Sequence, residues 1–241
     1  MSTAAILVIG NEILSAKVQD ENGPFLAREL RALGVELRRI ETVPDEVPLI
    51  VDALGRCRSQ ARWIFTSGGI GPTHDDVTIA AVAEAFGRKV VQDERTLELL
   101  RSRFGEPLKP ALRRLADVPE GAKVEFHEGH AFPVVSLENV VILPGVPSLL
   151  REGFLRIRDR FREAPIHGRA VYFAVGESTL AEHLDATVAQ FPTVAIGSYP
   201  RFDSADHRVK VTFDGRDAGQ VRAASDFLKK RLPADAIVRE E

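Results

Sequence analysis

The first two thirds of the chain alternate between short, wholly apolar runs and longer segments in which apolar positions recur with helical spacing. The continuous run Ala4–Ile9 predicts a strand covered on both faces, because an exposed face would carry alternating polar residues. Spacings of three and four, as in Leu26, Leu30 and Leu33, predict helices. The predicted elements are strand 4–9, helix 24–33, strand 35–43, helix 46–58, strand 62–66 and helix 76–86. This order predicts a three-layer α/β domain with a mostly parallel sheet and helices on both faces.

The rest of the chain contains shorter elements and one domain boundary. We expect a short strand at 90–91, a helix at 94–104, a surface excursion with a short helix at 105–121, strands at 123–127, 134–137 and 140–143, and a helix at 148–161. A boundary is expected near Pro165 and Gly168. Beyond it, the pattern predicts strands 170–175, 193–199, 208–213 and 236–238 and helices 179–189 and 218–232. This β-α-β-β-α-β order is typical of a ferredoxin-like α+β domain, so the expected domains are residues 1–164 and 169–241.

Composition and charge argue against several classes of function. The 241 residues carry 32 basic and 35 acidic side chains, which gives a net charge of −3. The sequence contains no basic stripe with interleaved aromatic residues, so a nucleic-acid partner is not expected. No apolar run approaches the roughly 20 residues that span a membrane, and no basic segment precedes the first strand as in a signal peptide. Cys57 is the single cysteine and lies among apolar helical positions, so we expect a buried free thiol and a cytoplasmic protein.

The segment from Ile64 to Thr78 carries the strongest chemical signal. An apolar strand enters a turn that contains Gly68, Gly69 and Gly71, and a helix is expected to follow at once. Glycines tolerate positive φ and close ligand approach, so backbone N–H groups can face inward, and a helix N-terminus adds a positive dipole end. The turn therefore predicts a phosphate cradle, although it lacks the fingerprints of a Rossmann site or a P-loop. A tight turn without a ligand is the alternative.

Asp75 and Asp76 follow the glycines and would repel a phosphate unless a cation lay between them. Two carboxylates about 4 Å from a phosphate would each be repelled by about 4 kcal/mol at an effective dielectric of roughly 20. Hard oxygen ligands suit a divalent cation such as Mg²⁺, Mn²⁺ or Co²⁺, and Asp45, after the second strand, is a further candidate ligand. We therefore expect Asp75 and Asp76 to be catalytic and metal-binding. The alternatives are a helix cap for Asp75 or Asp45 and a first-turn acid for Asp76.

Further ligand contacts are expected near this cradle. Asn11 and Glu12 follow the first strand, at the sheet edge where open α/β sheets bind ligands, and a solvated turn is their alternative role. Thr73 could donate its hydroxyl to phosphate or could only bond the turn. Gly145 shapes the turn after strand 140–143 and can bring backbone close to a ligand.

Several segments resemble the molybdopterin-binding, or MoCF-biosynthesis, fold family. They are Ile9–Leu14, Gln19–Asn22, Val43–Val47, Gly68–Thr78 and Leu143–Pro147. Over roughly Ala4–Phe161 the sequence looks closest to the N-terminal molybdopterin-binding-like region of eukaryotic FAD synthase and to the competence/damage-inducible protein A family. Ile196–Pro200 resembles the region that follows this module. The resemblance implies a module that binds a phosphorylated pterin or nucleotide and, in some relatives, cleaves a dinucleotide diphosphate such as FAD or ADP-ribose.

The same resemblance limits what is expected. Competence-protein relatives often carry an amidohydrolase domain and the eukaryotic synthase an adenylyltransferase domain; the sequence matches neither, so FAD synthesis is not expected. We expect a metal-dependent hydrolase, a pyrophosphatase, that acts on a nucleotide diphosphate linkage in a small phosphorylated ligand. Non-catalytic binding of molybdopterin or another phosphorylated pterin, and adenylyl transfer to molybdopterin, are the alternatives. The chain could also form a homo-oligomer.

Overall fold

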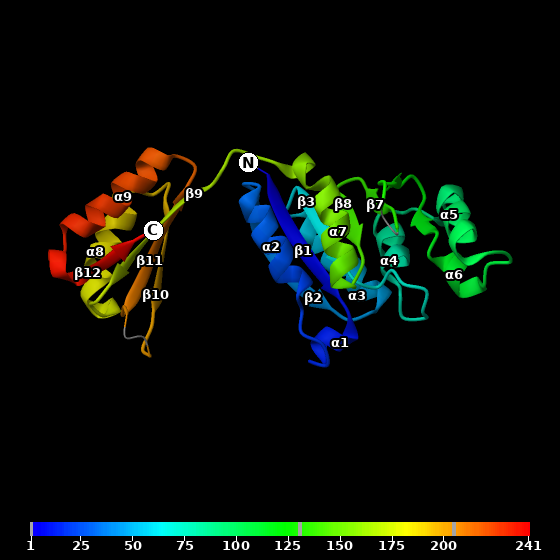
Figure 1. Ribbon diagram of the computed structural model, residues 1–241, viewed down its shortest axis with the longest axis horizontal. Coiled ribbons are helices and arrows are strands. Elements are labelled where there is room, and N and C mark those ends of the chain that lie inside the picture. Colours follow the sequence, from blue (N-terminus) through cyan, green and yellow to red (C-terminus); the bar gives the residue numbers. More distant parts are fainter. Residues whose placement is uncertain (1, 130–131, 204–205) are drawn as a thin grey trace. The chain divides into compact units, whose positions relative to one another are not determined.

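The computed structural model describes residues 2–129, 132–203 and 206–241 and is drawn in Figure 1. It divides into two compact units, Met1–Glu163 and Ala164–Glu241. The first contains β1 (Thr3–Ile9), α1 (Asn11–Leu14), α2 (Asn22–Ala32), β2 (Glu36–Val43), α3 (Val47–Arg58), β3 (Trp63–Ser67), α4 (Thr78–Ala85), β4 (Val90–Gln92), α5 (Glu94–Phe104), α6 (Pro110–Arg114), β5 (Asp117–Pro119), β6 (Lys123–Glu125), β7 (Val134–Leu137), β8 (Val140–Leu143), α7 (Pro147–Ile157) and the 3₁₀ helix η1 (Arg158–Phe161). The second contains β9 (His167–Phe173), α8 (Glu177–Gln190), β10 (Ala195–Pro200), β11 (Val209–Gly215), α9 (Ala218–Lys230), η2 (Ala234–Ala236) and β12 (Ile237–Glu240).

The first unit is built on a sheet with strand order β2-β1-β3-β8-β7-β6 over the described residues. β1 pairs in parallel with β2 and β3, and β3 pairs in parallel with β8. β7 and β6 complete the sheet in antiparallel orientation. The prediction of a mostly parallel sheet is therefore confirmed, and the parallel strands bring the turns after β1, β3 and β8 to one edge.

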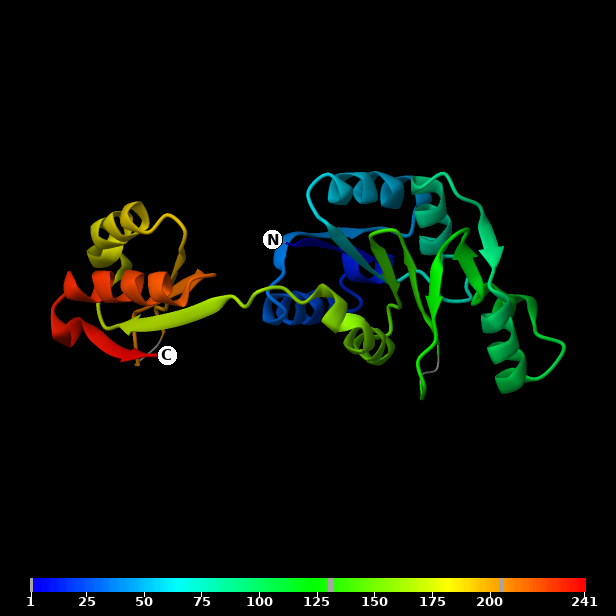
Figure 2. The same cartoon turned by 90° about the horizontal axis from the view of Figure 1, so that it is seen from above.

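Helices cover both faces of this sheet (Figure 2). On one face, Ile6 of β1 belongs to a core with Leu26 of α2 and Phe154 of α7. On the other face, Leu7 of β1 belongs to a core with side chains of α3 and α4, among them Cys57. Burial raises the pKa of the Cys57 thiol to about 11, so the expected buried, unreactive thiol is confirmed. Successive side chains of β1 point to opposite faces of the sheet and enter two different cores. The helices that complete these cores therefore form one layer on each side of the sheet.

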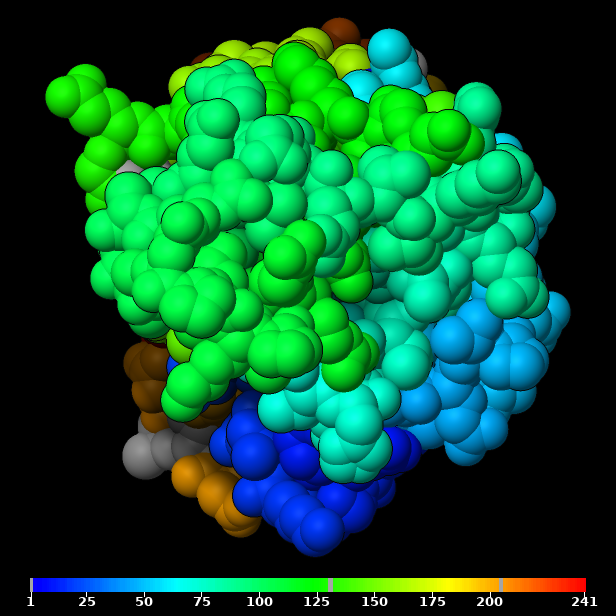
Figure 3. Space-filling model, turned by 90° about the vertical axis from the view of Figure 1, so that its right-hand side faces the viewer, coloured from blue at the N-terminus to red at the C-terminus, as the bar shows by residue number. Residues whose placement is uncertain are grey.

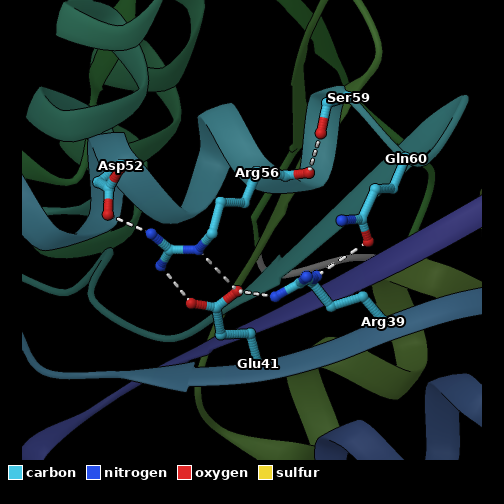
Figure 4. Close-up of polar contacts among 6 residues, drawn as sticks. All are labelled: Arg39, Glu41, Asp52, Arg56, Ser59 and Gln60. Carbon is cyan, nitrogen blue, oxygen red and sulfur yellow. Dashed lines mark hydrogen bonds and ion pairs between the residues drawn. The ribbon is translucent and has the colours of Figure 1, made fainter.

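An ion cluster fastens α3 to the edge of the sheet (Figure 4). β2 is an edge strand, and its Glu41 accepts hydrogen bonds from Arg56 of α3 and, at 3.0 Å, from Arg39. Arg56 also pairs with Asp52, and Arg39 donates to Gln60 at 3.1 Å. The Arg56 guanidinium holds the pKa of Glu41 below its ordinary value of 4.5.

The excursion between the core elements has a small structure of its own. The expected strand at 90–91 is β4, which pairs antiparallel with β5, a strand that the sequence did not predict. Leu97, Leu100 and Ala116 form a small separate core beneath α5 and α6. The excursion is therefore ordered, with a strand pair and a small core of its own.

The second unit has the predicted β-α-β-β-α-β order. Its antiparallel sheet has the strand order β10-β11-β9-β12 across the described residues. Leu180 of α8 and Val221 of α9 join Phe173 and Phe213 of the sheet in one core. The ferredoxin-like prediction is confirmed. Nowhere in the described residues does a helix have the length and apolar content that a membrane crossing requires.

Replacing Glu41 by Gln should lower the free energy of unfolding by about 1 kcal/mol at pH 7, because the half-buried carboxylate that pairs with Arg39 and Arg56 is lost. Since folding lowers the pKa of Glu41, its contribution is complete above the ordinary value of 4.5 and disappears as the pH falls through the lower folded value. Urea unfolding of both proteins from pH 7 to pH 3 should therefore show converging stabilities. Asp159→Asn, which changes an exposed ion pair, is the control and should have little effect on stability. A difference in stability between the wild-type protein and Glu41→Gln that does not change with pH would contradict the role given to the Glu41 carboxylate.

A chain that ends at Ala164 should fold with a single cooperative thermal transition. The two large cores of the first unit draw their buried members from residues between Ala4 and Phe161, and such a unit can fold alone. Circular dichroism during heating checks this. A shortened protein that is soluble but melts without cooperativity would show that the first unit is not autonomous.

Candidate functional site

Three turns meet at the carboxyl ends of β1, β3 and β8 and line a pocket of about 510 Å³. The chain goes from β1 to β2 on one side and then crosses to β3 on the other side of β1, and such a switch point is where open α/β sheets bind ligands. In Figure 3 the turquoise turn before α4 lies beside the dark blue α1. Six predicted site residues line the pocket: Glu12, Gly68, Gly69, Gly71, Asp76 and Gly145. Four others do not: Asn11, Asp45, Thr73 and Asp75.

The glycines allow the turns to approach one another closely. Gly68 and Gly69 have φ values of 104° and 66°, a region that side chains with a Cβ rarely adopt. A Cβ on Gly68 would lie 2.1 Å from the Ile9 carbonyl oxygen, and one on Gly69 would lie 2.3 Å from the Thr78 hydroxyl. A Cβ on Gly145 would lie 3.2 Å from the Gly68 Cα. Valine at Gly69 would therefore disturb the start of α4 as well as any ligand, so it does not isolate ligand binding.

Backbone N–H groups of two turns point to an anion site. The Gly68 N–H donates to the Leu143 carbonyl at 3.2 Å, and the Gly71 N–H donates to Asp76 at 2.6 Å. Four further N–H groups find no acceptor within the described chain, and all four residues line the pocket: Gly69, Ile70, Gly145 and Val146. Gly69 and Ile70 are partly buried and Gly145 and Val146 are exposed, so these N–H groups are open to solvent or to a ligand with several acceptor oxygens.

Asp76 organises the glycine turn. One carboxylate oxygen accepts the Gly71 N–H at 2.6 Å, and the other accepts the Thr73 N–H at 2.7 Å and the Thr73 hydroxyl at 2.5 Å. The expected helix start at Asp76 is wrong, because α4 begins at Thr78 and no side chain caps it. The alternatives of a helix cap for Asp75 and a first-turn acid for Asp76 are therefore also wrong. The carboxylate of Asp76 is instead committed to the backbone that precedes the helix.

Asp75 is more exposed and less committed. Its Oδ1 lies 2.6 Å from the Thr73 hydroxyl, which also contacts Asp76. A single hydroxyl proton can serve only one of these carboxylates at a time. The bond from Thr73 holds the pKa of Asp75 below its ordinary value, so the carboxylate is ionised at neutral pH. The structure thus places three oxygen atoms, from Thr73, Asp75 and Asp76, side by side at the rim of the turn.

Asp45 occupies a different place. Its Oδ2 accepts the Asn11 N–H at 2.8 Å and so ties the start of α1 to the end of β2. The cap role considered for Asp45 is wrong, because α3 starts after Glu46 without a side-chain cap. Among the described residues no three His, Cys, Asp or Glu side chains form a group able to hold a metal ion. The expected set of Asp45, Asp75 and Asp76 is corrected accordingly, since Asp45 does not join the other two.

Apolar side chains form most of the remaining wall, and the sequence interpretation missed them. They are Ile70, Ile79, Leu115, Val118, Phe132, Val134, Val135, Ile142, Leu143, Val146 and Leu149. Apart from Ile70, Leu143 and Val146, they come from segments outside the quoted motifs, so no single local motif could have signalled this wall. Asp117 and Glu152 add carboxylates to the same wall.

Two family models divide the chain between them. Residues 5–162 match the model described as "Probable molybdopterin binding domain", and residues 165–241 match "FAD synthase, middle domain". The solved structure of the protein CinA from Thermoplasma acidophilum, of unknown function, is similar with a TM-score of 0.62 and 26% identity, covering 66% of this chain and 98% of that one.

Relatives match over nearly the whole chain. A protein of Archaeoglobus fulgidus is 34% identical over 94% of this chain and 96% of its own length. A "Probable FAD synthase" of Caenorhabditis elegans is 31% identical over 98% of this chain, and the chain spans about half of it, 51%. A "CinA-like protein" of Gemmatimonas aurantiaca is 34% identical over 94% of this chain and 58% of its own length. These matches confirm the resemblance seen in the sequence, and the chain belongs to the family of molybdopterin-binding domains, here followed by an FAD synthase middle domain.

Proposed function

We propose that this chain cleaves a nucleotide diphosphate linkage, of the kind found in FAD or ADP-ribose, with the help of a divalent cation. The observation that carries the proposal is one pocket lined both by four residues whose backbone N–H groups have no acceptor in the described chain and by an apolar wall. The N–H groups suit a diphosphate, and the wall suits a planar ring attached to it. The volume of about 510 Å³ lies within the range of small-molecule sites.

Asp75, with the Thr73 hydroxyl and Asp76 beside it, presents the oxygen atoms that would hold the cation. Mg²⁺ commonly takes one or two carboxylates and completes its shell with water and substrate phosphates, so the pair suffices without Asp45. Asp76 already accepts two backbone N–H groups, which makes Asp75 the freer ligand. Bound there, the cation would supply Lewis-acid stabilisation of the charge on the phosphate oxygens.

The chain's own residues would bind and orient the ligand. The N–H groups of Gly69 and Ile70 donate to the diphosphate from one turn, and those of Gly145 and Val146 from the other. The bonds of Asp76 keep the first pair in place. Glu12 lines the same pocket and can accept a hydrogen bond from a ligand hydroxyl or ring N–H. The apolar wall excludes water from the ring, and a drier site strengthens the hydrogen bonds to phosphate.

A second candidate is binding of molybdopterin or another phosphorylated pterin without turnover. It is favoured by the family model that covers residues 5–162. The same N–H groups would take the phosphate and the same wall would take the pterin ring. Adenylyl transfer would need a further nucleotide site. The relatives named FAD synthase are about twice as long as this chain, so synthesis of FAD is not carried over.

One experiment separates these functions. The purified protein is incubated with FAD, ADP-ribose, coenzyme A and NAD, each with Mg²⁺, Mn²⁺ or Co²⁺, and mononucleotide products are sought by chromatography. Products that require the cation support the hydrolase. Tight binding of a phosphorylated pterin without any product supports the binding module, and the absence of both contradicts both functions.

The substitutions Asp75→Asn and Asp76→Asn should have different effects. Asp75→Asn removes a charge from an exposed carboxylate, so it should leave the melting temperature unchanged. It should lower cation-dependent turnover at least 10-fold, because mutation of even the outer-shell partners of a metal ion costs about 10- to 100-fold in metal affinity or activity. Asp76→Asn replaces one acceptor oxygen by a donor that faces a backbone N–H, so it should also cost about 1 kcal/mol of stability. Melts and product assays on each variant measure both effects.

Asp185→Asn, an exposed acid of the second unit, is the control for loss of charge. It should match the wild-type protein in stability and turnover. Wild-type turnover and wild-type cation response in Asp75→Asn would remove Asp75 from the cation site.

Leu149→Ala should weaken binding of ligands with a ring but spare simple diphosphates. Leu149 lines the pocket, and loss of its apolar contact is expected to raise the Kd for ADP-ribose roughly 10-fold, about 1.4 kcal/mol. The affinity for inorganic pyrophosphate should stay unchanged, because the N–H groups are intact. Calorimetric titrations with both ligands test this, and Leu155→Ala, which truncates an exposed leucine of the same helix, is the matched control. Equal weakening of both ligands would show that the wall does not contact the ring.

A further inference from the structure

Asn22, the first residue of α2, joins the two turns that carry the unpaired N–H groups. It is 6% exposed. Its amide nitrogen donates at 2.9 Å to the hydroxyl of Ser67, the last residue of β3, and at 2.7 Å to the carbonyl of Gly145. Both hydrogens of the amide are therefore used, one for the end of β3 and one for the turn after β8.

Asn22 is not needed to cap its own helix. Asp20 does this work, since its Oδ1 accepts the N–H groups of Asn22 at 2.9 Å and Gly23 at 3.0 Å. Asn22 itself supplies no side-chain cap to α2. Its Oδ1 is buried without a hydrogen-bond partner in the described chain. A buried acceptor left unpaired costs free energy, so stability alone does not explain an asparagine here.

The distance between the turns is sensitive to this one side chain. Gly68 follows Ser67 directly, and a Cβ on Gly145 would lie 3.2 Å from the Gly68 Cα, so the turns are in van der Waals contact. Gly69 and Ile70 follow Gly68 in the chain, and both line the pocket. A shift of the Gly145 turn therefore changes the separation of the two pairs of N–H donors directly.

We propose that Asn22 is a positioning residue, which sets the spacing of the Gly69–Ile70 and Gly145–Val146 N–H pairs to that of a diphosphate. The ligand part of this proposal rests on the proposed function, because a diphosphate has to occupy the pocket. The structural part, that Asn22 holds the two turns together, does not depend on the proposed function. Asn22 contacts neither ligand nor cation and acts through Ser67 and Gly145.

The structural part is tested by hydrogen exchange without any ligand. Asn22→Leu keeps the branched shape but cannot donate, and it removes the unpaired oxygen. The amides of Gly68 and Thr78, which donate to Leu143 and Gly69, should then exchange at least 10-fold faster relative to the amide of Leu7 in β1. Leu30→Ala, about 12 Å further along α2, should lower global stability without changing this ratio. An unchanged ratio in Asn22→Leu would overturn the proposal.

The ligand part is tested by titration with ADP-ribose in the presence of Mg²⁺. Asn22→Leu and Asn22→Asp should each raise the Kd at least 10-fold, Ser67→Ala should raise it less because the Gly145 bond remains, and Leu30→Ala should leave it unchanged. Wild-type affinity in both Asn22 variants would overturn the positioning role. If the wild-type protein itself does not bind ADP-ribose, the proposed function fails, whereas the exchange ratio still decides whether Asn22 holds the turns.

Discussion

The close approach of two turns, after β3 and after β8, is the constraint on which the candidate site depends. These strands are neighbours in the parallel sheet, so their turns leave the same edge side by side. Gly68 and Gly145 meet without side chains between them, and Asn22 holds the second turn to the end of β3. Any larger residue at this contact would separate the two turns that line the pocket. The glycines serve the packing of the protein first, and the proposed anion site depends on that packing.

The two adjacent acids have different tasks for the same geometric reason. A turn this tight leaves several backbone N–H groups without carbonyl partners, and Asp76 accepts two of them. Asp75 lies one residue earlier, in the exposed part of the turn. A charged acceptor for backbone N–H groups forms stronger hydrogen bonds than a neutral one, so Asp76 is tied to the fold, whereas Asp75 bonds the Thr73 hydroxyl and is the carboxylate proposed to bind the cation.

The relation to longer proteins has a structural counterpart. The chain's two compact units coincide closely with two family segments, and the same pair occurs within the longer proteins named FAD synthase. The pocket is lined wholly by residues of the first unit. The chemistry proposed here therefore needs only the molybdopterin-binding domain, and the ferredoxin-like unit is left for other roles.

The sequence by itself determined most of the elements and the glycine turn, because these depend on local spacing, but it missed the short elements α1 and β5. Apolar runs and helical periodicity are local properties, and they gave the parallel sheet, the ferredoxin-like order and the buried Cys57 correctly. The partners of polar side chains depend on which segments the fold brings together, and there the sequence failed. Asp45 bonds Asn11, Asp76 holds the turn, and Asn22 reaches Gly145, 123 residues away. The apolar wall also comes from distant segments, so only the tertiary structure could decide what lies opposite the phosphate cradle.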